Sequence, residues 1–190
     1  MAKLQGDAVA QWGWWIADKD DVAGAGDINL RCASIDTSDG SDRPAGRTAF
    51  PEAGEATYSG KALGQYAVVD GEDSESGAFE ATASLTAKFS GTGGAETKLS
   101  GSVHDFDVHS GWEVMLKENT ADRNGTSGLF TGNTVWKTGD DDGLGEGNWQ
   151  ASAYGGANGA EPDHVVGGFT AVDAGARMVG VFGGEPPKQE

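Results

Sequence analysis

The sequence has 190 residues, of which 32 are glycine and 5 are proline, and its formal net charge is −17 at pH 7. Glycine at this level without a three-residue period excludes collagen and is typical of β structure with many turns. The charge argues against nucleic acid, whose phosphates need basic patches, and against anionic membrane surfaces. It fits either a solvated acidic surface, as in salt-adapted proteins, or a surface matched to a basic partner. No apolar run approaches the ~20 residues of a membrane helix, so we expect a chain that does not span a membrane.

The first 50 residues are predicted to form an N-terminal β hairpin and a linker, packed on a barrel domain of residues 51–190. Residues 9–16 contain Trp12, Trp14 and Trp15, and residues 28–35 form a second apolar stretch; the polar segment between them favours a hairpin. The three tryptophans fit core packing or an aromatic ligand platform. Residues 37–55 are polar, hold two prolines and are typical of a linker. The start, MAKLQGDAVAQ, has no apolar region of a signal peptide.

Eight strand-like segments follow, at residues 57–69, 78–89, 97–106, 112–119, 129–137, 147–154, 164–171 and 176–182. The clearest is 78–89, where apolar residues from Phe79 to Phe89 alternate with polar ones, so that one face is apolar. The connections are too short for a parallel crossover helix, so neighbours should pair antiparallel. Closure would remove the exposed strand edges. The pattern predicts an all-β fold, an eight-stranded antiparallel up-and-down β-barrel with a short N-terminal β element.

The predicted interior mixes small and large side chains. An eight-stranded barrel is just wide enough to be filled by side chains or to hold one small ligand. The predicted inward positions include the small residues Gly64 and Ala81 and the large residues Trp112, Trp149 and Phe169. If small residues sit opposite large ones, the interior is filled.

Six segments carry a family resemblance: ATYSGKALG (56–64), FEATASLTAKF (79–89), KLSGSVHDF (98–106), GNWQASAYGG (147–156), VGGFTA (166–171) and MVGVFGG (178–184). Their order over roughly residues 55–184 resembles the β-barrel domain of the transferrin-binding protein B-like family of bacterial surface proteins. The same barrel is seen in factor H-binding and hemophilin-like surface proteins. The segment WGWW at 12–15 is similar to an aromatic segment that precedes the barrel in some relatives.

The resemblance implies a non-enzymatic, lipoprotein-like binding module, extracellular or at the outer-membrane surface. Its partner would be a protein or a small ligand at the cell surface, bound through loops. Relatives bind host transferrin, complement regulators or haem, and the resemblance singles out none of them for this chain. Two other functions stay open. One is a small-ligand carrier of the haem type, with the ligand in or at the barrel mouth; the other is a structural spacer domain of a large adhesin.

His104 and His109, in the segment HDFDVH, are the candidate cofactor-binding residues. Imidazole is a common haem-iron ligand. On a regular strand the two histidines would face opposite sides, so a joint metal site needs a bulge or turn between them. Ordinary surface histidines are the competing interpretation. Because Asp105 and Asp107 lie between them and no continuous apolar stretch adjoins, we predict that the chain has no cofactor and binds no haem.

Metal and catalytic sites are not expected either. The acidic segments 36–42 and 139–147 suggest calcium loops, yet neither has the EF-hand spacing, and solvated turns explain both. The lone Cys32 forms no internal disulfide and has no histidine within ten residues. No Gly-x-Ser-x-Gly elbow occurs, and the paired acids lie in turns without the desolvation that a general acid needs. We therefore predict no metal, no catalytic residues and no enzyme.

Overall fold

The structure is a computed structural model that describes residues 49–70, 73–118, 129–138, 145–155, 159–173 and 175–187, together with the backbone of three N-terminal strands. Those three are β1 (Ala2–Gly6), β2 (Gln11–Ile16) and β3 (Leu30–Cys32). The other strands are β4 (Ala53–Asp70), β5 (Asp73–Ser90), β6 (Lys98–His104), β7 (Trp112–Leu116), β8 (Leu129–Thr138), β9 (Gly145–Tyr154), β10 (His164–Asp173) and β11 (Ala176–Glu185). A 3-10 turn, η2 (Thr92–Gly94), lies between β5 and β6.

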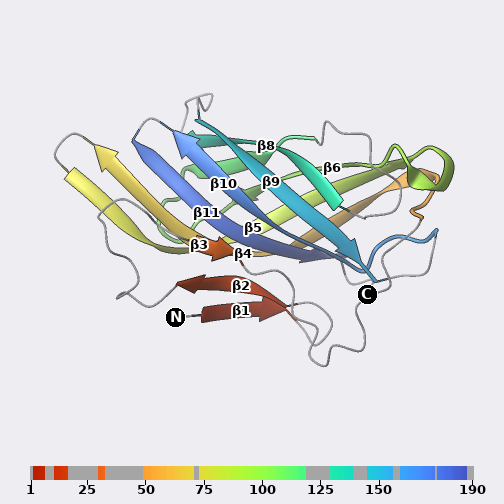
Figure 1. Cartoon of the computed structure of the whole chain (residues 1–190), viewed down its shortest axis with the longest axis horizontal. Helices are drawn as coiled ribbons and strands as arrows, with labels where there is room; N and C mark the ends of the chain where they lie inside the picture. The colour runs from red at the N-terminus through yellow and green to blue at the C-terminus, as the bar shows by residue number, and fades with distance from the viewer. Residues whose placement is uncertain are drawn as a thin grey trace.

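Strands β4 to β11 form one closed antiparallel barrel (Figure 1). Each strand pairs with the next one along the chain, and β11 pairs with β4 to complete the ring. The order is therefore up-and-down, and the prediction of an all-β, eight-stranded antiparallel barrel is confirmed.

The hairpin of β4 and β5 is longer at both ends than its apolar pattern indicates. Residues 53–56 were expected to belong partly to the linker, but they pair with β5, beginning with Ala53 opposite Ser90. At the other end the pairing continues to Asp70 opposite Asp73. At the second end the ladder hydrogen bonds continue where the buried face has ended, and alternation of apolar residues does not report them. β7 ends at Leu116, earlier than expected, and residue 119 lies outside the described residues.

Large aromatic rings lie opposite inward glycines and fill the space that the glycines leave in the barrel interior. Gly64 pairs with Phe79, and Gly132 pairs with Trp149. A Cβ atom at Gly64 would lie 2.6 Å from Cζ of Phe79, and one at Gly132 would lie 2.5 Å from Nε1 of Trp149. An aromatic ring on a neighbouring strand thus takes the space above each glycine. Small residues sit opposite large ones, and the inward side chains form one continuous buried cluster.

Phe50 covers the barrel end at which β4 begins. Its side chain is only 1 % exposed. Its ring centroid lies 6.1 Å from that of Phe89 and 5.8 Å from that of Phe130. Its backbone N–H donates a hydrogen bond to the carbonyl of Gly93 in η2, at 3.0 Å. The turn after β5 therefore holds Phe50 in place over this end.

The three N-terminal strands form a separate sheet in the order β1-β2-β3. β2 lies against β4 and β11, and β3 lies against β11 (Figure 1). On that wall Leu63, Val166 and Val181 alternate with inward residues and so point outward, yet they are only 0 %, 3 % and 1 % exposed. Leu63 and Val181 are cross-strand neighbours. The division into an N-terminal β element and a barrel domain stays a prediction.

Candidate functional site

The connection between β6 and β7 covers the barrel end opposite Phe50. Asp105 has φ 54°, a left-handed conformation that aspartate tolerates better than most residues. This residue interrupts the alternation, so that Phe106 points inward, with its ring centroid 5.0 Å from that of Phe79. Asp107 then fastens the connection to β5. Its N–H donates to the carbonyl of Glu80 at 3.0 Å, and its carboxylate accepts from the N–H of Glu80 at 2.8 Å.

Four side chains gather at this end, and we call them the mouth cluster: Tyr66, Glu75, His109 and Trp112. The imidazole of His109 stacks on the indole of Trp112, with centroids 4.0 Å apart and planes at 27°. Tyr66 meets both rings edge-on. Nε2 of His109 lies 3.4 Å from Oε1 of Glu75, and the hydroxyl of Tyr66 donates to the same oxygen at 2.5 Å. The extended β4–β5 hairpin brings Tyr66 and Glu75 to this end, opposite the β6–β7 connection.

Glu75 also controls the ionisation of Tyr66. The hydrogen bond to Glu75, burial of the ring, and the negative charges of Glu75 and Asp107 raise the pKa of Tyr66 from 10.0 to about 12. Each of these effects favours the neutral phenol over the phenolate. Tyr66 is therefore a hydrogen-bond donor to Glu75 at all physiological pH values.

His104 lies on the outer wall of the barrel, away from the mouth cluster. Its Nε2 is 2.9 Å from Oγ of Ser84, and its Nδ1 is 2.9 Å from Oδ2 of Asp105. The chain of contacts from serine to histidine to aspartate has the connectivity of a hydrolase triad. A triad also needs an oxyanion hole, and a nucleophile elbow supplies free backbone N–H groups for it. Ser84 instead lies mid-strand and is paired on both sides, with Ser59 and with Ser102.

The two candidate histidines therefore have different partners and different places in the fold. Both ring nitrogens of His104 are engaged, while His109 covers one ring face with Trp112 and directs Nε2 at Glu75. An axial haem ligand needs a free nitrogen that faces the porphyrin. Both nitrogens of His104 are taken, and Nε2 of His109, which makes no hydrogen bond, is buried beside the carboxylate of Glu75. Neither histidine therefore presents an open nitrogen to a porphyrin. Within the described ranges, no group of three or more His, Cys, Asp or Glu side chains could hold a metal ion.

Several candidate features fall outside the described residues. They are the acidic segment 36–42, residues 139–144 of the second acidic segment, and the side chains of Cys32, Trp12, Trp14 and Trp15. Tyr66 and Glu75 were not singled out from the sequence. The sequence does contain a sign of Glu75: it lies four residues before Phe79, so on a strand its carboxylate shares the inward face with that ring.

The comparisons with known proteins bear on the fold alone. No family model matches the chain, and no curated protein matches it. A solved structure does match, that of a mutant of transferrin-binding protein B (TbpB) from Haemophilus parasuis, described as a vaccine antigen. The TM-score is 0.51 at 14 % sequence identity, over 96 % of this chain. The barrel is TbpB-like.

The match covers 33 % of the TbpB chain, so this chain spans about a third of that protein's length. The expected likeness to factor H-binding and hemophilin-like proteins stays a prediction. Among the described residues, no helix has the length and apolar character needed to cross a bilayer.

Proposed function

We propose that this chain is a non-enzymatic binding module of the TbpB-like class, displayed outside the cell or at the outer-membrane surface. It binds a protein or a small ligand, and the ligand contacts the outer wall and the connections between strands. The likeness to TbpB, a protein named for binding transferrin, supports the class of function. It leaves the identity of the ligand open.

The filled and covered barrel is the observation that carries this proposal. The inward side chains form one buried cluster that includes Phe50 near one end and Phe106 near the other. Phe50 covers the first end, and the mouth cluster covers the second. A ligand inside the barrel would have to displace these aromatic contacts, each worth about 0.5–1.5 kcal/mol beyond the burial of area. The outer surface offers contact without that cost.

Surface labelling tests the location. Intact cells that make the protein are treated with a membrane-impermeant amine reagent. Lys61, Lys88 and Lys117 are exposed on the barrel and would report labelling. We expect their modification on intact cells at a level close to that in lysed cells. Modification that appears only after lysis would contradict a surface module.

A further inference from the structure

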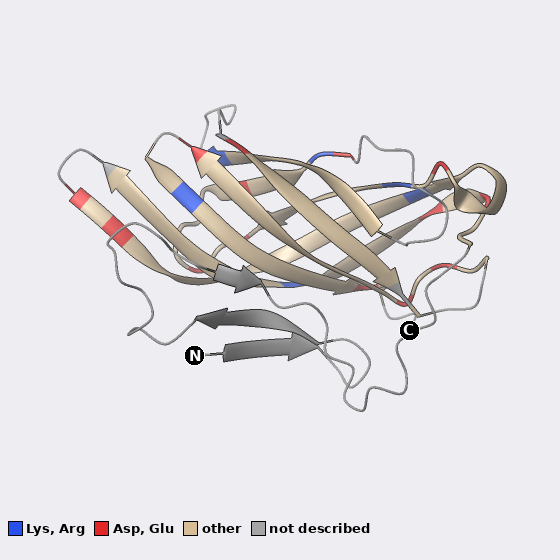
Figure 2. Ribbon diagram, viewed as in Figure 1, with Lys and Arg blue, Asp and Glu red and all other residues tan. Residues whose placement is uncertain are grey.

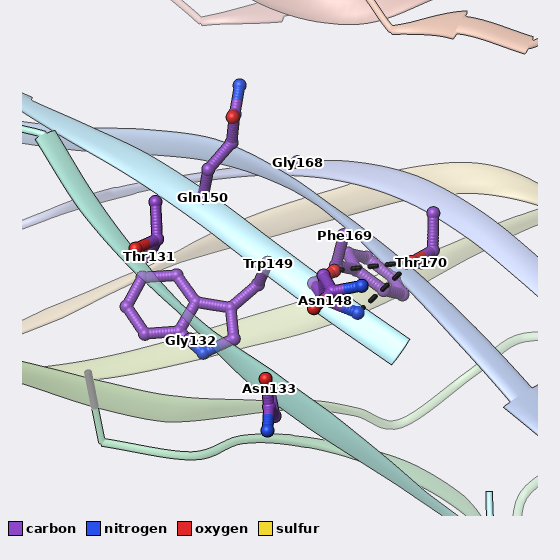
Figure 3. A pocket seen from close by; sticks show the side chains of 9 residues that line it. All are labelled: Thr131, Gly132, Asn133, Asn148, Trp149, Gln150, Gly168, Phe169 and Thr170. Carbon is purple, nitrogen blue, oxygen red and sulfur yellow. Dashed lines mark hydrogen bonds between the residues drawn. The ribbon is translucent and has the colours of Figure 1, made fainter. Parts of the chain in front are cut away.

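A groove of about 570 Å³ lies on the outer wall of the barrel, across β8, β9 and β10 (Figure 3). Pockets for small ligands typically measure 300–1,000 Å³, so this groove has room for one. The residues on its outer surface are Thr131 and Asn133 of β8, Asn148 and Gln150 of β9, and Gly168 and Thr170 of β10.

Strand register places these residues in two rows. Thr131 is opposite Gln150, which is opposite Gly168. In the next row Asn133 is opposite Asn148. Because Gly168 has no side chain, the wall is lowered on the β10 side. Amide side chains from neighbouring strands therefore stand beside a hollow.

The groove lies where the sheet begins to open. The last register pair between β9 and β10 is Trp149 with Phe169. Beyond it, the N–H of Asn148 donates to the hydroxyl of Thr170 at 3.1 Å (Figure 3). The hydroxyl of Thr134, which is fully buried, donates to the carbonyl of Thr170 at 2.6 Å. Threonine hydroxyls thus link the strands where the backbone register ends and fix their spacing. A site that is shaped before binding loses less entropy when it binds.

The groove carries no charge, although charged residues make up 23 % of the chain and its net charge is −17. Figure 2 shows the middle of β9 and β10 free of the red and blue residues that mark other parts of the barrel. Every polar side chain that lines the groove is an amide or a hydroxyl. The amides of Asn133, Asn148 and Gln150 and the hydroxyl of Thr131 can each donate and accept hydrogen bonds. The hydroxyl of Thr170 is used by the backbone of Asn148. The matching ligand is uncharged and presents many groups that donate and accept.

Two other classes of ligand fit less well. A peptide that adds a strand needs an open sheet edge, and the closed barrel presents none among β4 to β11. A ligand with an aromatic or long aliphatic group needs a large apolar side chain to cover, and the large apolar side chains among the lining residues, Trp149 and Phe169, are only 3 % and 2 % exposed. The indole N–H of Trp149 is already used, since it donates to the carbonyl of Lys117 at 2.9 Å.

We propose that this groove binds a neutral oligosaccharide. Adjacent hydroxyls of a sugar ring can each donate and accept, and they pair with the amides of Asn133, Asn148 and Gln150. The inference rests on the proposed binding function and names a class of ligand for it. A charged sugar is excluded because it would lose water without gaining an opposite charge.

The test titrates uncharged oligosaccharides of two to six units into the isotopically labelled full chain. The probes are built from glucose, mannose, galactose or N-acetylglucosamine, with sialyllactose as the anionic comparison, and amide chemical shifts are followed by NMR. We expect at least one neutral probe to bind with a Kd of about 1 mM or tighter, which corresponds to roughly −4 kcal/mol. The shifted amides should belong to β8, β9 and β10, and sialyllactose should leave them unchanged.

A pair of matched variants fixes the location. Gln150→Glu places a charge in the groove, and Gln65→Glu places the same charge on the outward face of β4. We expect the first to weaken binding at least tenfold and the second to leave it unchanged. The proposal is overturned if no neutral probe binds, if the shifts lie elsewhere, or if both variants lose binding equally. If the chain forms a dimer in solution and Gln150→Glu converts it to a monomer, the groove is a contact between two copies of the chain, and the proposal is also overturned.

The experiment uses purified protein, so it does not depend on where the cell places the chain. If a sugar binds but surface labelling fails, only the proposed location is overturned. Surface labelling without sugar binding would overturn the groove alone.

Discussion

The ring of Phe79 lies over Gly64, its cross-strand partner, so closely that a Cβ atom on the glycine would be 2.6 Å from Cζ of the ring. The same Cβ would lie 2.2 Å from the backbone carbonyl oxygen of Val179 on β11. Glycine at this position therefore serves two contacts at once. The high glycine content of the chain is partly a packing requirement of the barrel wall.

Gly180 on β11 gives the cleanest test of this packing, because its nearest neighbours are ring atoms. A Cβ there would lie 2.6 Å from Cε1 of Phe169. We expect Gly180→Ala to lower the free energy of unfolding by about 1–3 kcal/mol, the usual cost of overpacking. Adding Phe169→Leu should recover part of that loss, so that the double variant costs less than the sum of the singles. Urea denaturation measures all three variants.

Gly64→Ala serves as the control for this cycle. Its added methyl group meets a backbone oxygen, which no side-chain change removes. Phe79→Leu should therefore recover little of its cost. If the losses of unfolding free energy in Gly180→Ala and Phe169→Leu simply add in the double variant, contact with the ring is not the reason that glycine is needed at position 180.

The contact of Tyr66 with Glu75 predicts a pH dependence at alkaline pH. The folded chain keeps the phenol proton to a pKa of about 12, whereas the ordinary value is 10.0. Between these values the unfolded state has lost a proton that the folded state still binds, so stability falls as the pH rises through this window. Below pH 10 the contribution is complete. We expect Tyr66→Phe to flatten the stability curve in this window.

Glu75→Gln separates the causes of the raised pKa. It removes the carboxylate that accepts the hydrogen bond and carries the charge, so the pKa of Tyr66 should move back toward 10.0. Phenolate absorbance, taken as the difference between each chain and its Tyr66→Phe version, reports that pKa. An unchanged titration in Glu75→Gln would mean that burial and the charge of Asp107, not Glu75, govern the pKa of Tyr66.

Leu63 tests whether the N-terminal sheet is held on the barrel wall. Leu63 points outward from β4 but is buried, and β2 lies against this strand. A carboxylate buried there without a partner would be costly. We expect Leu63→Asp to speed tryptic cleavage after Lys19 and Arg31 at least tenfold, with the barrel still folded by circular dichroism. Thr57→Asp is the control, since Thr57 is exposed on the same strand. Equal cleavage rates in both variants would refute the packing of residues 1–50 on the barrel.

The contact of Ser84 with His104 leads to a further prediction. Although these residues and Asp105 are linked as in a hydrolase, the mid-strand position of Ser84 withholds its N–H from any oxyanion. We expect no labelling of Ser84 by a fluorophosphonate probe under conditions that label a serine hydrolase fully. Labelling that disappears in both Ser84→Ala and His104→Ala would make the chain an enzyme.

The barrel could be predicted from the sequence because alternation in strands such as β5 reports burial on one face. The end of the β4–β5 hairpin near Ser74 and Ser76 could not, since both faces of β5 are exposed there. The histidines could be named, but not their partners. The left-handed turn at Asp105 redirects the chain, and cross-strand register brings Glu75 to His109. The amide rows of the groove likewise depend on the register of separate strands.

A haemin titration tests the central claim most directly, since that claim places ligands outside a filled barrel. Haemin is added to the full chain at micromolar concentration, and the Soret band is followed. We predict no saturable shift, because both nitrogens of His104 are engaged, Nε2 of His109 is buried beside Glu75, and both barrel ends are covered. A saturable shift that His104→Ala or His109→Ala abolishes would contradict the account and favour a haem carrier.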